Sequence, residues 1–226
     1  MIKNEIHAII LARKNSKGIK DKNILLINKK PMIYWTIISA ILSKTISTTW
    51  VSSDSKKILN ISKKLGANII SRPSKFSKDS SSSESAWIDA VKQIYKKKKY
   101  PEIIVGLQVT SPIRKINHID LAIKKFKQKG YDSLFSSTAI KDHFIWKYQN
   151  KKLEPNYNID KRKPRQKIKS QYLENGSIYI FKTKKFLQNK SRLFGNIGNF
   201  VMSKKYSFQI DTIEDAEIVN LMMKSK

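Results

Sequence analysis

The sequence predicts an α/β fold in which a mostly parallel sheet carries helices on both faces. Three observations lead to this prediction. Short runs such as Ile6–Leu11 are continuously apolar, as expected for strands that are buried on both faces of a sheet. Segments with helical periodicity alternate with these runs, which is typical of parallel strands joined by helices. The chain has 226 residues, of which 40% are hydrophobic, so one domain with a substantial core is expected.

Each predicted strand is a short apolar or β-branched run bounded by turn or polar residues. The polar segment Arg13–Asn23, which follows the first strand and contains one glycine, is expected to form a loop. In chain order, strands are expected at Ile6–Leu11, Thr49–Ser53, Ala67–Ile70, Glu102–Gln108, Ser133–Ser137, Ser177–Phe181 and Tyr206–Ile210.

The predicted helices follow from capping residues and from apolar spacing. Pro31 suits the start of a helix over Met32–Leu42. Asp54 is expected to cap the next helix, which Gly66 ends. Further helices are expected over Glu84–Tyr95, after Asn117 where Ile119, Ala122, Ile123 and Phe126 recur at helical spacing before Gly130, and from Thr212, which forms a capping pair with Asp215.

The alternation of strands and helices stops between Lys141 and Asn175. This segment is polar, basic and irregular, so we interpret it as a small arm, residues 141–175, inserted in a single domain that spans residues 1–226. With so little apolar content, the arm is not expected to fold alone.

The chain is strongly basic, with 46 Lys and Arg against 17 Asp and Glu and a formal net charge of +29. Such a charge favours binding to polyanions. Only six of the 46 cations are arginines, the residue that reads bases bidentately, and lysine is frequent all along the chain. We therefore expect nucleic acid to bind only non-specifically, through charge.

Composition also excludes several classes of site. The chain has no cysteine, which excludes disulfides, thiolate catalysis and cysteine metal sites. The apolar runs are far shorter than the roughly 18–20 residues that span a bilayer, so no membrane partner is expected. The first apolar run has no small-residue cleavage site after it, and a cytoplasmic location is expected.

The loop after the first strand is the first candidate site, because ligands of open α/β sheets bind beyond the carboxyl ends of the strands. Its sequence matches neither GxGxxG nor GxxxxGK[ST]. It carries Ser16 and four cations, Arg13, Lys17, Lys20 and Lys22. Four cations on one short loop could neutralise a triphosphate, although in a lysine-rich protein they could also be a solvated surface.

A series of sequence blocks extends this pattern along nearly the whole chain. The blocks are IILARKNSKGIKDKN from Ile9, VSSDSKKI from Val51, SRP from Ser71, DSSSSES from Asp79, LQVTSPIR from Leu107, PRQ from Pro164, ENGSIYIF from Glu174 and IDTIEDAE from Ile210. In order and spacing they resemble the CMP-sialic acid synthetases, or acylneuraminate cytidylyltransferases. The resemblance implies a Rossmann-like nucleotidyltransferase sheet and a homodimer, with residues 141–175 as the exchanged dimerisation arm.

The resemblance also implies an activity and its residues. The family uses CTP and Mg²⁺ to convert a nonulosonic, keto-sugar acid to its CMP-sugar, with release of pyrophosphate; here a legionaminic- or pseudaminic-type sugar fits as well as sialic acid. The implied nucleotide-binding residues are Arg13, Ser16, Lys17, Lys22, Asn23, Arg72 and Ser83. The implied catalytic residues are Arg13, Lys17, Lys22 and Asp211, of which Asp211 holds the metal. The implied sugar-binding residues are Gln108, Arg165, Gln166, Asn175 and Tyr179.

Other interpretations remain open at this point. The net charge alone would suit a nucleic-acid-binding protein. Gln209 stands where the family usually has a second aspartate, which would suit a catalytically inactive homologue acting as a scaffold. Singly, Arg72 could be a surface arginine before a proline, and Ser83 could cap a helix.

Overall fold

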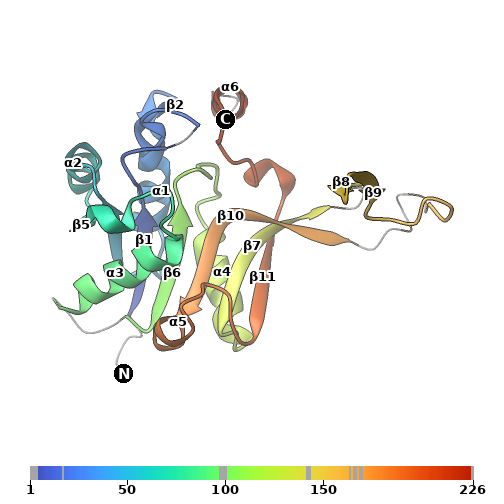
Figure 1. The fold of residues 1–226 in the computed structure, drawn as a ribbon. Helices are drawn as coiled ribbons and strands as arrows, with labels where there is room; N and C mark the ends of the chain where they lie inside the picture. Colours follow the sequence, from blue (N-terminus) through green and yellow to red (C-terminus); the bar gives the residue numbers. More distant parts are fainter. Residues whose placement is uncertain are drawn as a thin grey trace.

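A seven-stranded sheet organises the molecule in the computed structural model, with strand order β11-β7-β10-β6-β1-β4-β5 (Figure 1). The structure describes residues 5–16, 18–96, 101–140, 144–162, 164, 167 and 170–224. The strands of this sheet are β1 (Ile6–Leu11), β4 (Thr48–Ser53), β5 (Asn68–Ser71), β6 (Ile103–Gln108), β7 (Ser133–Ile140), β10 (Gln171–Lys182) and β11 (Ile197–Met202).

The sheet is mostly parallel, as predicted. Strand β1 pairs in parallel with β4 and β6, β4 with β5, and β11 with β7. Strand β10 is the exception, because it lies antiparallel between β6 and β7. The strand predicted at Ser177–Phe181 is therefore the second half of a longer strand that is inserted against the direction of its neighbours.

Helices cover both faces of the sheet, and each face has its own hydrophobic cluster (Figure 1). Helices α3 and α5 pack on one face, and α1, α2, α4 and α6 contribute to the cluster on the other. The helices span Met32–Ile41 (α1), Lys56–Lys64 (α2), Ser83–Tyr95 (α3), His118–Gln128 (α4), Thr183–Asn189 (α5) and Ile213–Lys224 (α6).

Two of the predicted elements are wrong in detail. Tyr206–Ile210 is not a strand: Tyr206 ends a 3₁₀ helix over Lys204–Tyr206, and the residues after it are irregular. Tyr206 and Ile210 are apolar because they pack in the core, not because they pair in the sheet. The predicted cap of α2 is also wrong. Ser55 caps this helix by accepting from the Ile58 amide, whereas the Asp54 carboxylate accepts from the Lys14 amide at 2.8 Å.

Several elements were not predicted. They are the edge strand β11, the short helix α5 and the two-residue strands β2 (Leu26–Ile27) and β3 (Lys30–Pro31), which pair with each other. Strand β11 has Gly198 and Asn199 at its centre, two residues that are depleted in strands, and it pairs with a neighbour on one side only. Its position therefore depends on tertiary pairing.

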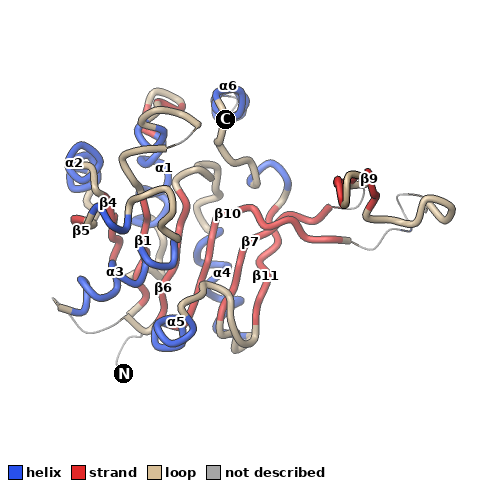
Figure 2. Tube along the Cα trace, viewed as in Figure 1, coloured by secondary structure: helices blue, strands red, loops and turns tan. Residues whose placement is uncertain are grey.

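The predicted arm projects from the end of β7 and β10, and its described part contains an antiparallel hairpin (Figures 1 and 2). The hairpin consists of β8 (Trp146–Gln149) and β9 (Lys152–Pro155), with Asn150 and Lys151 in left-handed conformations at its turn. Strand β10 already begins at Gln171, so the irregular part of the arm ends before the predicted boundary at residue 175. Residues 141–143 and parts of 163–169 lie outside the described residues.

Trp87 anchors α3 to the sheet, and its removal should be costly. The side chain is 1% exposed, and its ring lies 5.7 Å from that of Phe181. We expect Trp87→Ala to lower the free energy of unfolding by about 3–5 kcal/mol, the usual cost of emptying a large aromatic site. Urea unfolding followed by circular dichroism measures this loss.

Tyr95→Ala is the matched control, because Tyr95 lies on the same helix and is 54% exposed. Its effect should stay within about 0.5 kcal/mol, as for ordinary surface substitutions. A Trp87→Ala variant as stable as this control would contradict the packing described for α3.

Candidate active site

A cavity of about 620 Å³ opens where β1, β5 and β6 end. The carboxyl ends of these strands lie together because Leu11 is in register with Gln108 and with Ser52, and Ser53 with Ser71. The described residues that line the cavity are Leu11, Arg13, Ser16, Gly18, Lys22, Asn23, Arg72, Phe76, Lys78, Asp79, Ser81, Ser82, Ser83, Ala86, Trp87, Leu107, Gln108, Val109, Thr110 and Asp211.

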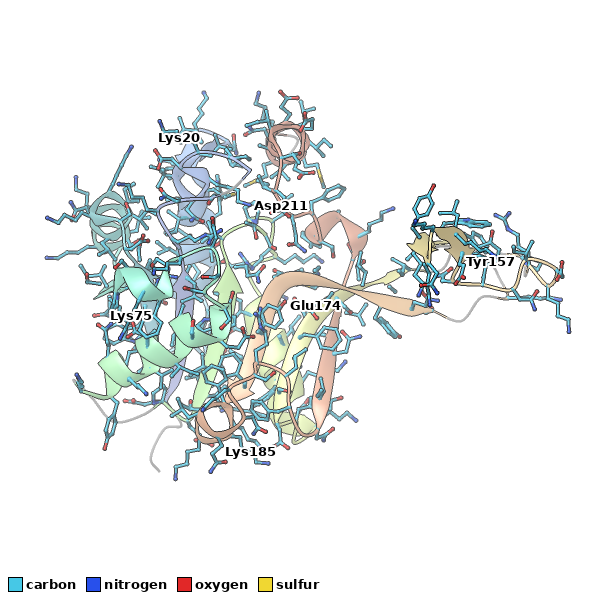
Figure 3. All side chains as sticks on the ribbon, viewed as in Figure 1. Lys20, Lys75, Tyr157, Glu174, Lys185 and Asp211 are labelled. Atoms are coloured by element: carbon cyan, nitrogen blue, oxygen red, sulfur yellow. The ribbon has the colours of Figure 1, made fainter. Side chains whose placement is uncertain are left out.

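This lining brings together eight of the thirteen site residues that the sequence predicts: Arg13, Ser16, Lys22, Asn23, Arg72, Ser83, Gln108 and Asp211. Figure 3 shows Lys20, on the loop after β1, and Asp211 at the same end of the sheet, with Lys185 at the opposite end. Lys17, Arg165 and Gln166 lie outside the described residues, so their predicted roles remain predictions.

The Arg13 side chain contacts the serine-rich segment before α3. Its Nη1 lies 2.9 Å from Asp79 Oδ1 and donates to the Lys78 carbonyl at 3.4 Å. Asn23 is buried and holds the Arg13 backbone, because its Nδ2 donates to the Arg13 carbonyl at 2.8 Å. The role of Asn23 in this geometry is to fix the loop that carries the arginine.

Lys22 and Asp211 also line the cavity, and they pair with each other. Lys22 Nζ lies 2.8 Å from Asp211 Oδ1 and donates to the Ile210 carbonyl at 3.2 Å. A side chain at position 18 would not fit, since a Cβ on Gly18 would come within 2.8 Å of the Asp211 carbonyl oxygen. The loop after β1 therefore packs directly against the segment that carries Asp211.

The predicted capping pair fixes this segment from the other side. Thr212 Oγ1 accepts from the Asp215 amide at 3.2 Å, and Asp215 Oδ2 accepts from the amides of Thr212 and Asp211 at 2.9 Å each. These amide hydrogen bonds lower the pKa of the Asp215 carboxyl. The Asp215 carboxylate is thus used in capping α6, whereas the Asp211 carboxylate pairs with Lys22 in the cavity lining.

Arg72 is a buried cation at the base of the cavity, not a surface arginine. It is 6% exposed, its Nη2 donates to the Ser52 carbonyl at 2.7 Å, and its buried Nε has no hydrogen-bond partner. Burial lowers the pKa of its guanidinium, against the raising effect of Asp54 and Asp89. Arg72 lines the cavity, and a guanidinium is well suited to a polar ligand.

Ser83 is not the cap of α3. Ser82 has that role, because its side chain accepts from the Ser85 amide at 3.1 Å. Ser83 is the first helical residue and lines the cavity. The cap and the candidate ligand are therefore two adjacent serines.

Gln108 stands at the end of β6, where Arg114 holds its backbone. Arg114 Nη2 donates to the carbonyls of Gln108 at 2.8 Å and Ser177 at 2.9 Å, so it connects β6 with β10. Burial lowers the pKa of Arg114 to about 9. Its guanidinium therefore remains charged at neutral pH and fixes the position of Gln108.

Asn175 and Tyr179 are not among the described residues that line the cavity. The Asn175 side chain is buried and accepts from Ser136 Oγ at 2.6 Å, while it donates to Ser207 Oγ at 3.0 Å. The Tyr179 hydroxyl donates to the Glu174 carboxylate, and its ring packs against Trp87. Burial, followed by the contact with Glu174, raises the pKa of Tyr179, so the hydroxyl keeps its proton.

Sequence reasoning missed Lys78, Asp79, Trp87 and Thr110 as lining residues. Asp79 belongs to one of the quoted sequence blocks, but nothing in its local sequence indicates that it pairs with Arg13, 66 positions away in the chain. Trp87 could be recognised from sequence only as a core residue of α3. Among the described residues, no group of three or more His, Cys, Asp or Glu side chains could hold a metal.

Comparison with known families decides the classification of this chain. The family model described as cytidylyltransferase matches residues 7–221. The chain belongs to the cytidylyltransferase family. The match includes every described residue that lines the cavity.

Curated relatives of this cytidylyltransferase bear the family name that the sequence blocks indicated, which confirms the resemblance. N-acylneuraminate cytidylyltransferase A of Danio rerio is 34% identical over 211 residues, which are 91% of this chain and 48% of the relative. N-acylneuraminate cytidylyltransferase of Streptococcus agalactiae serotype V is 31% identical over 212 residues, 92% of this chain and 50% of the relative. The chain thus spans about half the length of these relatives.

A solved structure of CMP:2-keto-3-deoxy-manno-octonic acid synthetase, complexed with CTP, has the same fold as this cytidylyltransferase. The TM-score is 0.72 at 19% sequence identity, and the match covers 98% of this chain and 99% of the other. The predicted fold class is confirmed. In the described part of the chain, no helix combines the length and the apolar character needed to cross a membrane.

The cations that line the cavity predict that it binds an inorganic polyphosphate. Arg13→Ala should weaken the binding of tripolyphosphate by about tenfold or more, because a hydrogen bond to a charged group contributes roughly 1.5–3 kcal/mol. Isothermal titration calorimetry at constant ionic strength measures the change. Lys14→Ala, which removes the same charge from an exposed neighbour that does not line the cavity, is the control. Equal losses in the two variants would mean that only net charge matters.

Proposed function

We propose that this chain transfers the cytidylyl group of CTP to a nonulosonic sugar acid and releases pyrophosphate. The observation that carries the proposal is the cavity itself, which joins the cationic loop after β1 with Arg72 and Asp211 in a member of the cytidylyltransferase family. The names of the relatives support an acylneuraminate-like acceptor.

In the proposed reaction, the anomeric hydroxyl of the sugar acid attacks the α-phosphorus of CTP in line. The bond from that phosphorus to the bridging oxygen breaks, and pyrophosphate leaves. Charge grows on the leaving group, and Arg13 and Lys22 line the wall where cations would stabilise it. Ser16 and Lys17 belong to the same loop and would complete the triphosphate site. The chain's main contribution is then electrostatic and positional.

The proposed cytosine site lies at Arg72 and Ser83, with Asn23 positioning the loop beside them. Both residues line the cavity; the Arg72 guanidinium is a donor, and the Ser83 hydroxyl can both donate and accept. A cytosine ring offers carbonyl and ring-nitrogen acceptors and an amino donor, which suit this set together with nearby backbone groups. A uracil would present a donor where cytosine has an acceptor and would leave polar groups unpaired.

A magnesium ion fits this site through Asp211. Its side chain is 66% exposed, and its Oδ1 pairs with Lys22. Mg²⁺ is usually bound by one or two carboxylates plus substrate phosphates and water, so a single aspartate suffices. When bound, the ion would neutralise charge on the phosphates. Lys22 would keep the aspartate oriented.

The proposed sugar site extends from Gln108 toward β10 and the arm. Arg165 and Gln166 are proposed to bind the sugar carboxylate, for which a bidentate arginine is suited. Asn175 and Tyr179 are proposed to act there too; in this structure both are buried beneath the site and hydrogen-bonded to other residues.

The test of the proposed function is pyrophosphate release by the purified chain with Mg²⁺, CTP and a panel of nonulosonic acids that includes N-acetylneuraminic and legionaminic acid. We expect release with at least one acid, and a strong preference for CTP over UTP, ATP and GTP. Binding of CTP without release would support an inactive scaffold. Steeply salt-dependent binding of nucleic acid without binding of CTP would support the nucleic-acid interpretation.

The magnesium proposal makes a prediction about Asp211. Asp211→Asn should lower the rate of pyrophosphate release by at least about 10²-fold, since a neutral amide replaces one preorganised charge. Circular dichroism should remain unchanged, because Thr212 and Asp215 still form the capping pair. The measurement is the rate as a function of Mg²⁺ concentration.

Asp21→Asn is the matched control for this variant. Asp21 is exposed on the loop after β1, next to the Lys22 that pairs with Asp211, and has a φ of 54°, which asparagine tolerates. It should keep the wild-type rate. Near-normal release by Asp211→Asn would place the metal elsewhere.

We also propose that the arm pairs with a second copy of the chain. The hairpin exposes Trp146 and Tyr148, at 44% and 78%, and Leu153 at 51%. Beside them, Tyr157 packs between Phe144 and Trp146, with Arg162 over the Phe144 ring. Apolar and aromatic residues on a projecting hairpin are typical of a protein interface.

The expected result is a dimer in wild-type protein and a monomer in the double variant Trp146→Ser, Tyr148→Ser, as measured by light scattering after size exclusion. Removing two large apolar contacts should weaken the interface by about 2 kcal/mol or more per residue if they are hot spots. Ile116→Ser, which alters an apolar residue that is 64% exposed on the body of the domain, should remain dimeric. A monomeric wild type would refute the dimer.

A further inference from the structure

Two glutamine side chains from distant parts of the chain meet above one glycine. A Cβ built on Gly176 would lie 2.5 Å from Gln108 Oε1 and 3.3 Å from Gln209 Oε1. Gln108 ends strand β6, whereas Gln209 lies in the irregular segment before α6. The two amides therefore share one small region beside the cavity that Gln108 lines.

The backbone of Gln209 is fixed on both sides. The Ile210 amide donates to the Thr110 carbonyl at 2.8 Å, and Ile210 is fully buried. Before Gln209, the Ser207 hydroxyl accepts from Asn175 Nδ2 at 3.0 Å, and Phe208 packs against the core. With Phe208 and Ile210 both directed at the core, the Gln209 side chain reaches Gly176 from a rigid segment.

Gln108 is equally well positioned. Its carbonyl accepts from Arg114 Nη2, and its strand is hydrogen-bonded on both sides, to β1 and β10. Gly176 has a φ of +63°, a conformation that glycine adopts without strain, and it lacks the side chain that would displace both amides. Neither amide makes a hydrogen bond with another described residue.

The chemistry of the pair indicates the class of ligand. Each amide offers one acceptor oxygen and two N–H donors but no charge. Phosphate and carboxylate groups select cations, which here lie on the loop after β1 and at Arg72. Hydroxyl groups both donate and accept, so neighbouring hydroxyls of a sugar match two neutral amides.

We propose that Gln209 is a substrate-binding residue that acts with Gln108 to bind hydroxyl groups of the acceptor sugar acid. This inference rests on the proposed function and assigns Gln209 to the sugar, not to the metal or to CTP. It predicts that the identity of residue 209 affects selection of the sugar, while CTP binding depends on the cationic wall.

The experiment compares wild type with Gln209→Ala, Gln108→Ala and the double variant. For Gln209→Ala, we expect the KM for the best sugar acid to rise by about tenfold, equivalent to one lost hydrogen bond at 1.4 kcal/mol, and the KM for CTP to change less than about twofold. The double variant should lose less than the product of the single effects, because the two amides share one ligand. Gln128→Ala, an exposed glutamine at the end of α4, is the control.

A second variant addresses the glycine. Gly176→Ala should raise the KM for the sugar acid at least as much as Gln209→Ala, because its Cβ would displace the Gln108 amide, 2.5 Å away, and crowd that of Gln209 at 3.3 Å. Gln209→Ala with an unchanged KM for the sugar, or with changes only in the KM for CTP or in the magnesium dependence, would overturn the inference.

Calorimetric titration of the sugar acid in the presence of CTP distinguishes failure of the inference from failure of the proposed function. If wild type binds the sugar acid and Gln209→Ala does not, the inference stands even without pyrophosphate release. If wild type releases pyrophosphate and Gln209→Ala retains full affinity, the function stands and the inference fails. If wild type binds no sugar acid, both fail.

Discussion

The ion pair between Lys22 and Asp211 closes the site, because it joins segments that lie 189 positions apart in the chain. The described part of the loop after β1 contains a short 3₁₀ helix over Lys22–Ile24 and is otherwise irregular, so its shape depends on what it contacts. Gly18 permits the close approach to the Asp211 backbone, and Asn23 holds Arg13 from within the loop. The loop after β1 and the segment before α6 therefore have to meet to form this part of the cavity lining.

The cations that line the cavity already have protein partners, which a bound polyanion would replace. Arg13 and Lys22 are each paired with a carboxylate, Asp79 and Asp211, whereas the buried Arg72 donates to the Ser52 carbonyl. Both carboxylates are more than half exposed, so phosphate could replace them as partners of the two cations. Arg72 adds a buried positive charge that favours anions in the cavity.

Strand β10 connects the proposed nucleotide site with the proposed sugar site in one sheet. Its second half lies antiparallel against β6 and places Gly176 beside Gln108. Its first half leaves the sheet with β7 and carries the arm away from the body (Figures 1 and 2). A register shift between Glu174 and Tyr179 separates the two halves, at the point where Asn175 turns inward and supports Ser207. Geometry at the sugar side is therefore coupled to the base of the arm.

The sequence by itself determined the elements whose causes are local. Strands buried on both faces, such as β1 and β6, are continuous apolar runs, and the capping pair of Thr212 and Asp215 is only three residues apart. The sequence blocks likewise identified the cavity lining at Arg13, Lys22, Arg72 and Asp211. Tertiary structure alone decided that Tyr206–Ile210 packs without pairing, that β11 forms an edge, and that Gln209 and Gln108 meet at Gly176. Each of these depends on hydrogen bonds or contacts between distant segments, whose partners no local pattern specifies.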